Sequence, residues 1–287
     1  MEYSTIEELI ELAKENNLSV SEVVIKSEME DSEKEKDEIF SQMKNTFKVM
    51  REAVKEGKDK DEKSPSGLSG GDAKRLSNFD DFLGDNIYKK VMTYAVATSE
   101  VNASMGKIVA GPTAGSSGIV PATLLAVGEK IEAEDDEIVK ALFTASGLGM
   151  VVSKKATLAG AAGGCQAECG VGSAMAAGAA VELLGGSPNM VGHAFALALK
   201  NLLGLVCDPV AGLVEVPCVK RNGFASSHAL TATNMALAGV ESVIPPDEVV
   251  EAMTQIGNLL PGSLKETSLG GLATTETGCR IADRLDE

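Results

Sequence analysis

The sequence predicts an all-α protein, a multi-helix globular domain whose helices pack closely through small residues. Two observations predict this class. Residues 134–205 carry apolar residues at helical spacing with frequent Gly and Ala, and the alternation of β-branched and polar residues that marks strands is nearly absent. Helix-start signals recur along the chain, at residues 5–8, 19–22, 187–188 and 245–248.

The first residues of the chain hold two capping boxes. In this motif a Ser or Thr hydroxyl accepts a hydrogen bond from a backbone N–H three residues later, and a Glu at that position accepts one from the N–H of the cap. Thr5 with Glu8 therefore predicts one helix. Ser19 with Glu22 predicts a second helix, which we expect to run to about Lys55.

Charged residues are concentrated in residues 1–63, which we interpret as a charged helical N-terminal segment at the edge of the protein. The mixed charges at 28–38 indicate a solvated helix face or, alternatively, a face that docks a partner. Residues 64–72 are rich in Gly and Ser and predict a linker, with a lid over a site as the alternative. Residues 73–287 then form the main all-α domain.

Composition restricts the partners and the compartment. A net charge of −16 argues against nucleic acid or an anionic membrane surface, because the long-range field repels both. No apolar signal region follows a basic start, so we expect a cytoplasmic protein without a membrane-spanning segment. Five cysteines are an odd number without regular spacing, which favours reduced thiols over disulfides.

Three cysteines lie in segments rich in Gly and Pro. Two prolines and a glycine between Cys207 and Cys218 prevent one continuous helix, so this loop must double back, and Cys165 follows a Gly-Gly pair. Three soft thiolates without a histidine at short spacing suit an iron–sulfur cluster better than a hard cation. From the residues alone, buried structural cysteines and a zinc site that includes Cys169 remain alternatives.

Three polar segments surround these cysteines in the sequence. Residues 111–118 (GPTAGSSG) place hydroxyls and backbone N–H groups before a helix, which suits a carboxylate; a simple N-cap turn is the alternative. Residues 220–222 (Lys-Arg-Asn) follow Cys218 and offer positive charge and hydrogen bonds, unless they are plain surface charge. Residues 265–271 (KETSLGG) are more polar than a terminal linker needs, so we expect the tail to fold back over the site.

Together these motifs resemble one known family. CDPVAGLVEVPC (207–218), GPTAGSSGIVP (111–121) and KETSLGGLA (265–273) are similar to the iron–sulfur L-serine dehydratases, in particular to the catalytic alpha chain of the two-subunit type. The resemblance covers most of the chain. It implies an all-α catalytic domain around a cluster-bearing loop region, conversion of L-serine to pyruvate and ammonia, and a separate beta subunit.

The resemblance also implies the site residues. Cys165, Cys207 and Cys218 would hold a [4Fe-4S] cluster whose open iron acts as a Lewis acid on the substrate hydroxyl. Cys279 is a possible ligand at the fourth position, and Cys169 is not required. The residues assigned to substrate binding are Thr113, Ser116, Ser117, Asn222, Thr267, Ser268 and Gly270. The candidates for the base that removes the Cα proton are His193, His228, Lys220 and Lys265.

One candidate base lies on the helix that leads to the cysteine loop. Ser187 and Pro188 begin this helix, and Cys207 follows its end. His193 and Lys200 lie seven residues apart, so they share a helix face that we expect to point toward the cluster. A histidine that packs in the core is the alternative.

Other functions fit parts of the sequence. A related cluster lyase of the L-cysteine desulfidase type would share the three ligands and differ in its pocket. A zinc-stabilised thiolate interaction module would use four cysteines without catalysis. A pyridoxal-phosphate dehydratase would need a Schiff-base lysine and a Gly-rich phosphate loop, for which only residues 66–71 offer a hint.

Overall fold

The computed structural model describes residues 1–80 and 82–287, and within these ranges the chain forms thirteen α-helices, five short 3-10 helices and no β-strand. The all-α prediction is confirmed. The α-helices are α1 (Ile6–Glu15), α2 (Val20–Ser32), α3 (Lys36–Asp59), α4 (Asp72–Ser77), α5 (Asn86–Ala103), α6 (Ile119–Ile131), α7 (Asp135–Lys155), α8 (Gly160–Gly163), α9 (Cys169–Leu183), α10 (Pro188–Lys200), α11 (Cys218–Leu237), α12 (Pro246–Leu259) and α13 (Glu276–Asp286). The 3-10 helices are η1 (Ala114–Ser116), η2 (Cys165–Ala167), η3 (Val210–Gly212), η4 (Gly262–Leu264) and η5 (Gly271–Thr274).

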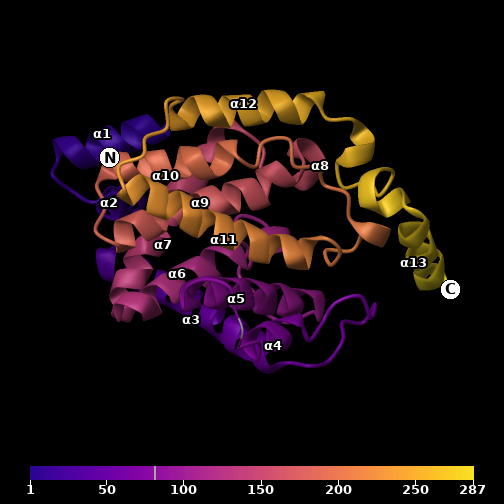
Figure 1. Ribbon diagram of the computed structural model, residues 1–287. Coiled ribbons are helices and arrows are strands. Elements are labelled where there is room, and N and C mark those ends of the chain that lie inside the picture. The colour runs from indigo at the N-terminus through magenta and orange to yellow at the C-terminus, as the bar shows by residue number, and fades with distance from the viewer. Residues whose placement is uncertain (81) are drawn as a thin grey trace.

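Helix α9 lies at the centre of the bundle, and α6, α7, α10 and α11 pack around it (Figure 1). Its sequence consists almost entirely of small residues, and every residue from Cys169 to Val181 is buried. A Cβ at Gly178 would lie 2.6 Å from the side chain of Leu148 on α7, so the two helices approach more closely than a larger residue would permit. The predicted close packing through small residues is confirmed.

Both predicted capping boxes form at the start of the chain. The Thr5 and Ser19 hydroxyls accept hydrogen bonds from the backbone N–H groups of Glu8 and Glu22, at 2.9 and 3.2 Å. The helices that follow bury their apolar side chains in the same hydrophobic core as the later helices. The buried residues include Ile6, Leu9, Val20 and Val23.

The prediction of one long second helix is wrong. Helix α2 ends at Ser32, and α3 begins only at Lys36. Between them, Glu33 adopts the left-handed conformation, with φ of 56°. A left-handed residue cannot continue a right-handed helix, so the chain turns here and α3 then runs past Lys55 to Asp59.

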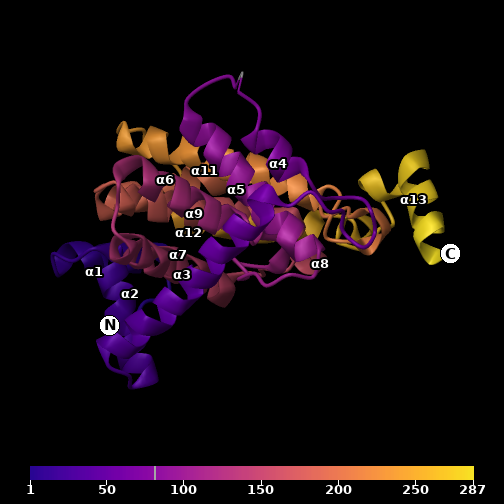
Figure 2. The same ribbon diagram turned by 90° about the horizontal axis from the view of Figure 1, so that it is seen from below.

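The cysteine-bearing loops lie toward one end of the bundle. Helices α8 and α13 and the start of α11 are at this end, whereas α1 and the N-terminus are at the opposite end (Figures 1 and 2). Helix α13 extends away from the body of the molecule, and Gly278 is its one buried residue. Among the described helices, none combines the length and the apolar character needed to cross a membrane.

Candidate active site

Three cysteines and one glutamate lie together where α8, α9 and α11 meet the loop after α10. Cys165 belongs to η2, Cys218 is the first residue of α11, and Cys207 lies in the loop. The Cys207 Sγ is 3.7 Å from Oε2 of Glu168. Burial raises the pKa of Cys207, and the charges of Cys165 and Cys218 contribute to the same shift, so all three predicted ligands share one electrostatic neighbourhood.

The pKa values of the three thiols reflect their burial and the charges around them. Burial, followed by the charge of Glu168, raises the pKa of Cys207 above its usual range. Burial likewise raises the pKa of Cys218 to about 12. Cys165 differs, because a hydrogen bond from the Cys169 thiol lowers its pKa. Buried thiols of this kind stay protonated unless a positive centre takes the place of the protons.

The donor set fits a cluster in its chemistry. In the described part of the chain, no group of three or more His, Cys, Asp or Glu side chains is close enough to hold a single metal ion. A four-iron cluster is larger than one ion and takes soft thiolates as ligands. The Arg221 guanidinium also interacts electrostatically with Cys165 and Cys218, so one positive charge already faces the thiolates.

The segment from Cys207 to Cys218 doubles back, as its Pro and Gly residues predict. The Val210 N–H donates a hydrogen bond of 2.9 Å to the Val216 carbonyl, which closes the loop. Gly212 lies in the turn with φ of 70°, a conformation that glycine adopts without strain. Because the loop reverses direction, Cys207 and Cys218 at its two ends lie near each other.

The C-terminal tail folds back onto this loop, as expected. The Cys207 N–H donates to the Leu264 carbonyl at 2.9 Å, and the Glu266 N–H donates to the Cys207 carbonyl at 2.7 Å. The Ser268 hydroxyl donates to the Pro209 carbonyl at 2.7 Å. The tail thus fixes the backbone on both sides of Cys207.

Arg221 and Asp208 form a second connection between these segments. The guanidinium donates to Oδ1 of Asp208 and to the Val206 carbonyl, both at 2.9 Å. The other Asp208 oxygen accepts a hydrogen bond from the Leu272 N–H at 2.9 Å. Next to it, Gly271 has φ of 63°, and a Cβ there would lie 2.5 Å from the Asp208 carboxylate. The close approach of the tail therefore depends on a glycine.

The loop at 111–118 reaches the cysteines through Glu168. The Thr113 hydroxyl donates to Oε1 of Glu168 at 2.7 Å, and the Ser116 hydroxyl lies 3.2 Å from that of Thr113. The Ser117 hydroxyl is buried without a hydrogen-bond partner in the described structure. Burial raises the pKa of Glu168.

Sequence reasoning missed Glu168, although a signal was present. It is one of few charged residues in the apolar stretch 141–245, and it stands between Cys165 and Cys169. A carboxylate in such a stretch is costly to bury without partners. Its position next to a cysteine indicated that its partners would lie at the site.

Asn222 connects the 111–118 loop to the start of α11. Its Oδ1 accepts from the Gly118 N–H at 3.0 Å, and its Nδ2 donates to the carbonyls of Gly115 at 2.7 Å and Cys218 at 2.9 Å. The side chain is buried, so each of these bonds replaces one with water. The protein's own backbone thus occupies the amide assigned to substrate binding.

We expect Asn222→Ala to lower the free energy of unfolding by about 2–4 kcal/mol, because it removes the three hydrogen bonds that this buried side chain forms with the backbone. Denaturant unfolding monitored by circular dichroism measures this loss. Asn234→Ala is the matched control: Asn234 lies on the same helix, is exposed, and donates to the Leu230 carbonyl of its own helix. An equal loss in both variants would contradict a connecting role for Asn222.

Comparison with known proteins identifies the family. The family model described as "Serine dehydratase alpha chain" matches residues 15–273 of this chain. The chain belongs to the serine dehydratase alpha-chain family. The "Probable L-serine dehydratase, alpha chain" of Bacillus subtilis is 49% identical over 286 residues, which cover 99% of this chain and 95% of that protein.

Other members of the family differ in length. The "L-serine dehydratase, alpha chain" of Peptoniphilus asaccharolyticus is 44% identical over 97% of this chain and 96% of its own length. The "L-serine dehydratase 1" of Escherichia coli is 36% identical over 94% of this chain but over only 61% of its own length. The latter protein therefore contains a further part that this chain does not match.

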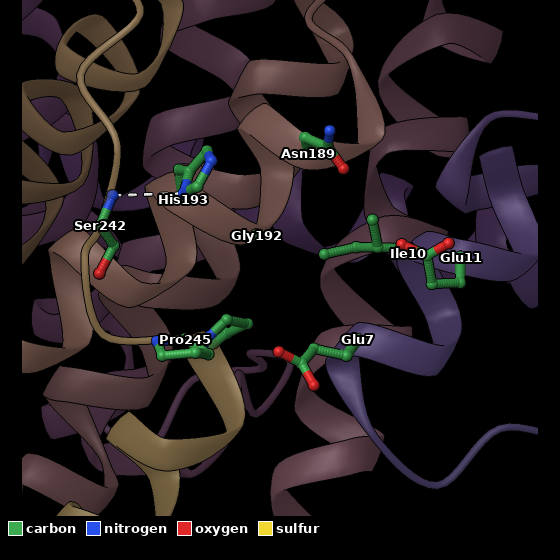
Figure 3. A pocket seen from close by; sticks show the side chains of 9 residues that line it. Glu7, Ile10, Glu11, Asn189, Gly192, His193, Ser242 and Pro245 are labelled. Carbon is green, nitrogen blue, oxygen red and sulfur yellow. Dashed lines mark hydrogen bonds between the residues drawn. The ribbon is translucent and has the colours of Figure 1, made fainter.

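In this family member, His193 lies away from the cysteine loops. The shared face of His193 and Lys200 points to residues 240–246: the Ser242 N–H donates to Nδ1 of His193 at 3.2 Å, and Lys200 donates to the Ser242 hydroxyl at 3.2 Å. His193 lines a pocket of about 320 Å³ together with Glu7 and Asn189, between α1 and the start of α12 (Figure 3). The expectation that this face points toward the cysteines is not met.

The other three candidate bases have different surroundings. His228 lies ten residues after Cys218 on α11, a rise of about 15 Å along the helix, and its Nε2 is 2.9 Å from the Ala198 carbonyl. Lys220 forms an ion pair of 2.5 Å with Asp72. Lys265 is half-buried, and its backbone pairs with that of Cys207. Lys220 lies two residues after Cys218, and Lys265 comes from the segment whose backbone pairs with Cys207.

The remaining predicted residues lie in the tail. The Thr267 hydroxyl donates to the Gly262 carbonyl at 3.0 Å, and Gly270 is extended with φ of −164°. Cys279 is exposed on α13, and its Sγ lies 4.0 Å from the Ala273 carbonyl. The contacts of Cys279 therefore include none of the other cysteines.

Proposed function

We propose that this chain is the catalytic alpha subunit of an L-serine dehydratase, which converts L-serine to pyruvate and ammonia. The proposal rests mainly on one observation: two buried thiols and one partly buried thiol, those of Cys165, Cys207 and Cys218, gather at one doubled-back loop in a member of the serine dehydratase alpha-chain family. We further propose that Cys165, Cys207 and Cys218 hold a [4Fe-4S] cluster. When bound, the cluster supplies a Lewis acid that assists the departure of the substrate hydroxyl.

The residues of this chain have defined tasks in the proposal. We assign the substrate carboxylate to the 111–118 loop, which Thr113 fixes to Glu168. Ser117 contributes a buried hydroxyl whose hydrogen-bonding capacity is free for a substrate oxygen. Arg221 offsets part of the negative charge that the thiolates bring into the buried site.

The overall reaction balances without an oxidant. Removal of the Cα proton and loss of the β-hydroxyl as water give an enamine, which hydrolyses to pyruvate and ammonia. The base must stand near the substrate when it is bound at the thiolate site. Lys265, beside Cys207, meets this requirement better than His193 or His228.

We also propose a separate beta subunit and a cytoplasmic location. The relatives from Bacillus subtilis and Peptoniphilus asaccharolyticus, which match this chain over nearly their whole length, are named alpha chains, and that name implies a second chain. All five cysteines of this chain are free thiols, which a reducing compartment maintains.

A substrate comparison tests the proposed reaction. Anaerobically purified protein with its partner chain is incubated with L-serine or L-cysteine, and pyruvate and hydrogen sulfide are measured. We expect kcat/KM for L-serine to exceed that for L-cysteine by at least about tenfold, since the site must recognise a hydroxyl rather than a thiol. Sulfide release from L-cysteine that is faster than pyruvate formation from L-serine would instead support the desulfidase-type lyase.

A further inference from the structure

Glu215 is a buried carboxylate in the loop between the two cysteines of CDPVAGLVEVPC. Its side chain is about 5% exposed, and no Lys or Arg of the described residues forms an ion pair with it. Burying a carboxylate without partners is costly. The hydrogen-bond donors around Glu215 therefore show what stabilises its buried charge.

Three serine hydroxyls, all from the segment 64–72, donate to Glu215. Ser64 donates to Oε2 at 2.6 Å, Ser66 donates to Oε1 at 2.7 Å, and Ser69 donates to Oε2 as well. Ser64 and Ser69 are themselves buried, so both ends of these bonds are withdrawn from water. The sequence predicted a linker here, and the structure gives it contacts that a plain connector does not need.

The segment 64–72 also forms a contact with the chain on the C-terminal side of Cys218. Asp72 forms the ion pair with Lys220, two residues after Cys218, whereas Glu215 lies three residues before it. The segment is anchored to the bundle by Glu100 of α5, whose buried carboxylate accepts from the Asp72 N–H at 2.7 Å. Cys218 thus stands between two contacts with one anchored segment.

The backbone of the segment 64–72 places its serine hydroxyls where they reach Glu215. The Ser64 N–H donates to the Ser69 carbonyl at 3.0 Å, so the segment forms a closed loop that turns its hydroxyls to one side. Gly70 has φ of 114°, and a Cβ there would lie 2.2 Å from the Glu62 carbonyl. The loop closure therefore requires glycine at this position, which accounts for part of the Gly-rich composition.

We propose that residues 64–72 are a clamp that positions Cys218, acting through Glu215 and Lys220. The serines and Glu215 are positioning residues, because they act on the cysteine and not on the substrate. The proposal rests on the proposed function only in taking Cys218 as a cluster ligand. The clamp itself is a property of the metal-free chain and is testable without a cluster.

The first experiment measures the accessibility of Cys218 in the full-length, metal-free protein. Iodoacetamide is added under native conditions, and the alkylation rate of each cysteine is followed by peptide mass spectrometry. In Ser64→Ala and Ser66→Ala, we expect Cys218 to react about tenfold faster, since a hydrogen bond to a charged group contributes at least that factor. The rates of Cys165 and of the exposed Cys279 should not change.

Matched variants separate positioning from general stability. Ser153→Ala is the control, because the Ser153 hydroxyl is exposed and bonds only to the Met150 carbonyl of its own helix. Ser64→Thr keeps the hydroxyl and should restore the slow rate at Cys218. The clamp is refuted if Cys218 keeps its rate in the folded Ser64→Ala protein, or if all cysteines accelerate equally.

A spectroscopic measurement tests the consequence for a bound cluster. After anaerobic reconstitution with iron and sulfide, an iron chelator is added and the visible absorbance of the cluster is followed. Glu215→Gln should lose this absorbance about tenfold faster than wild type, since an amide nitrogen cannot accept a bond from a serine hydroxyl and the carboxylate charge is removed. Equal decay would overturn the clamp, whereas failure of the wild-type protein to take up a cluster would refute the proposed function and leave the alkylation result standing.

Discussion

Cys165→Ser, Cys207→Ser and Cys218→Ser are each expected to yield protein without a cluster and with activity lowered by at least about a thousandfold, since the Lewis acid is worth several kcal/mol. A serine hydroxyl is a hard ligand that does not replace a thiolate on iron. The measurements are iron and sulfide content after anaerobic purification, and pyruvate formation from L-serine.

The other two cysteines provide the matched controls. Cys169 is buried beside Cys165 and Cys279 is exposed on α13, so the pair covers both environments. Cys169→Ser and Cys279→Ser should keep the cluster, because neither thiol is among the three proposed ligands. Full iron content in Cys165→Ser, Cys207→Ser or Cys218→Ser would refute the ligand assignment.

The isolated chain is expected to turn over L-serine at no more than about a hundredth of the rate of the assembled enzyme, since groups that complete a site contribute at least such factors. The reason is that the relatives which this chain matches over nearly their whole length are named alpha chains, a name that implies a second chain in those enzymes. The measurement compares kcat for the chain alone with kcat after the beta chain is added.

Two controls make this comparison decisive. Iron content must be equal in both samples, so that a difference in rate reflects the partner and not the cluster. Size-exclusion chromatography must show that the two chains elute together. Full turnover by this chain alone, at equal iron content, would contradict the need for a partner.

Local signals predicted much of the fold. The capping boxes at Thr5 and Ser19 act within three residues, so the sequence alone is sufficient to place the starts of α1 and α2. The break at Glu33 had no such signal, because a glutamate rarely adopts φ of 56°.

The parts of the site whose geometry depends on nearby residues were predicted from the sequence. The parts that depend on partners far away in the sequence were missed. Proline and glycine fix the doubling back between Cys207 and Cys218 locally. Glu168 and Glu215 depend on hydroxyls 55 and 151 residues away, on Thr113 and Ser64, which no local pattern indicates.

The contacts made by one face of α10 were also not predictable from the sequence. Spacing correctly placed His193 and Lys200 on one face of α10, since residues seven apart lie on the same side of a helix. Spacing does not say what that face contacts. Both side chains bind Ser242 because α10 packs with that face toward the segment before α12.

The most direct test of the central claim is an analysis of the wild-type chain purified without oxygen. We predict brown protein with about four iron and four sulfide per chain, as a [4Fe-4S] cluster requires, and an absorbance that bleaches in air together with the activity toward L-serine. Colourless protein with one tightly bound zinc per chain, and no pyruvate formed in the presence of the beta chain, would contradict the account and support a thiolate interaction module.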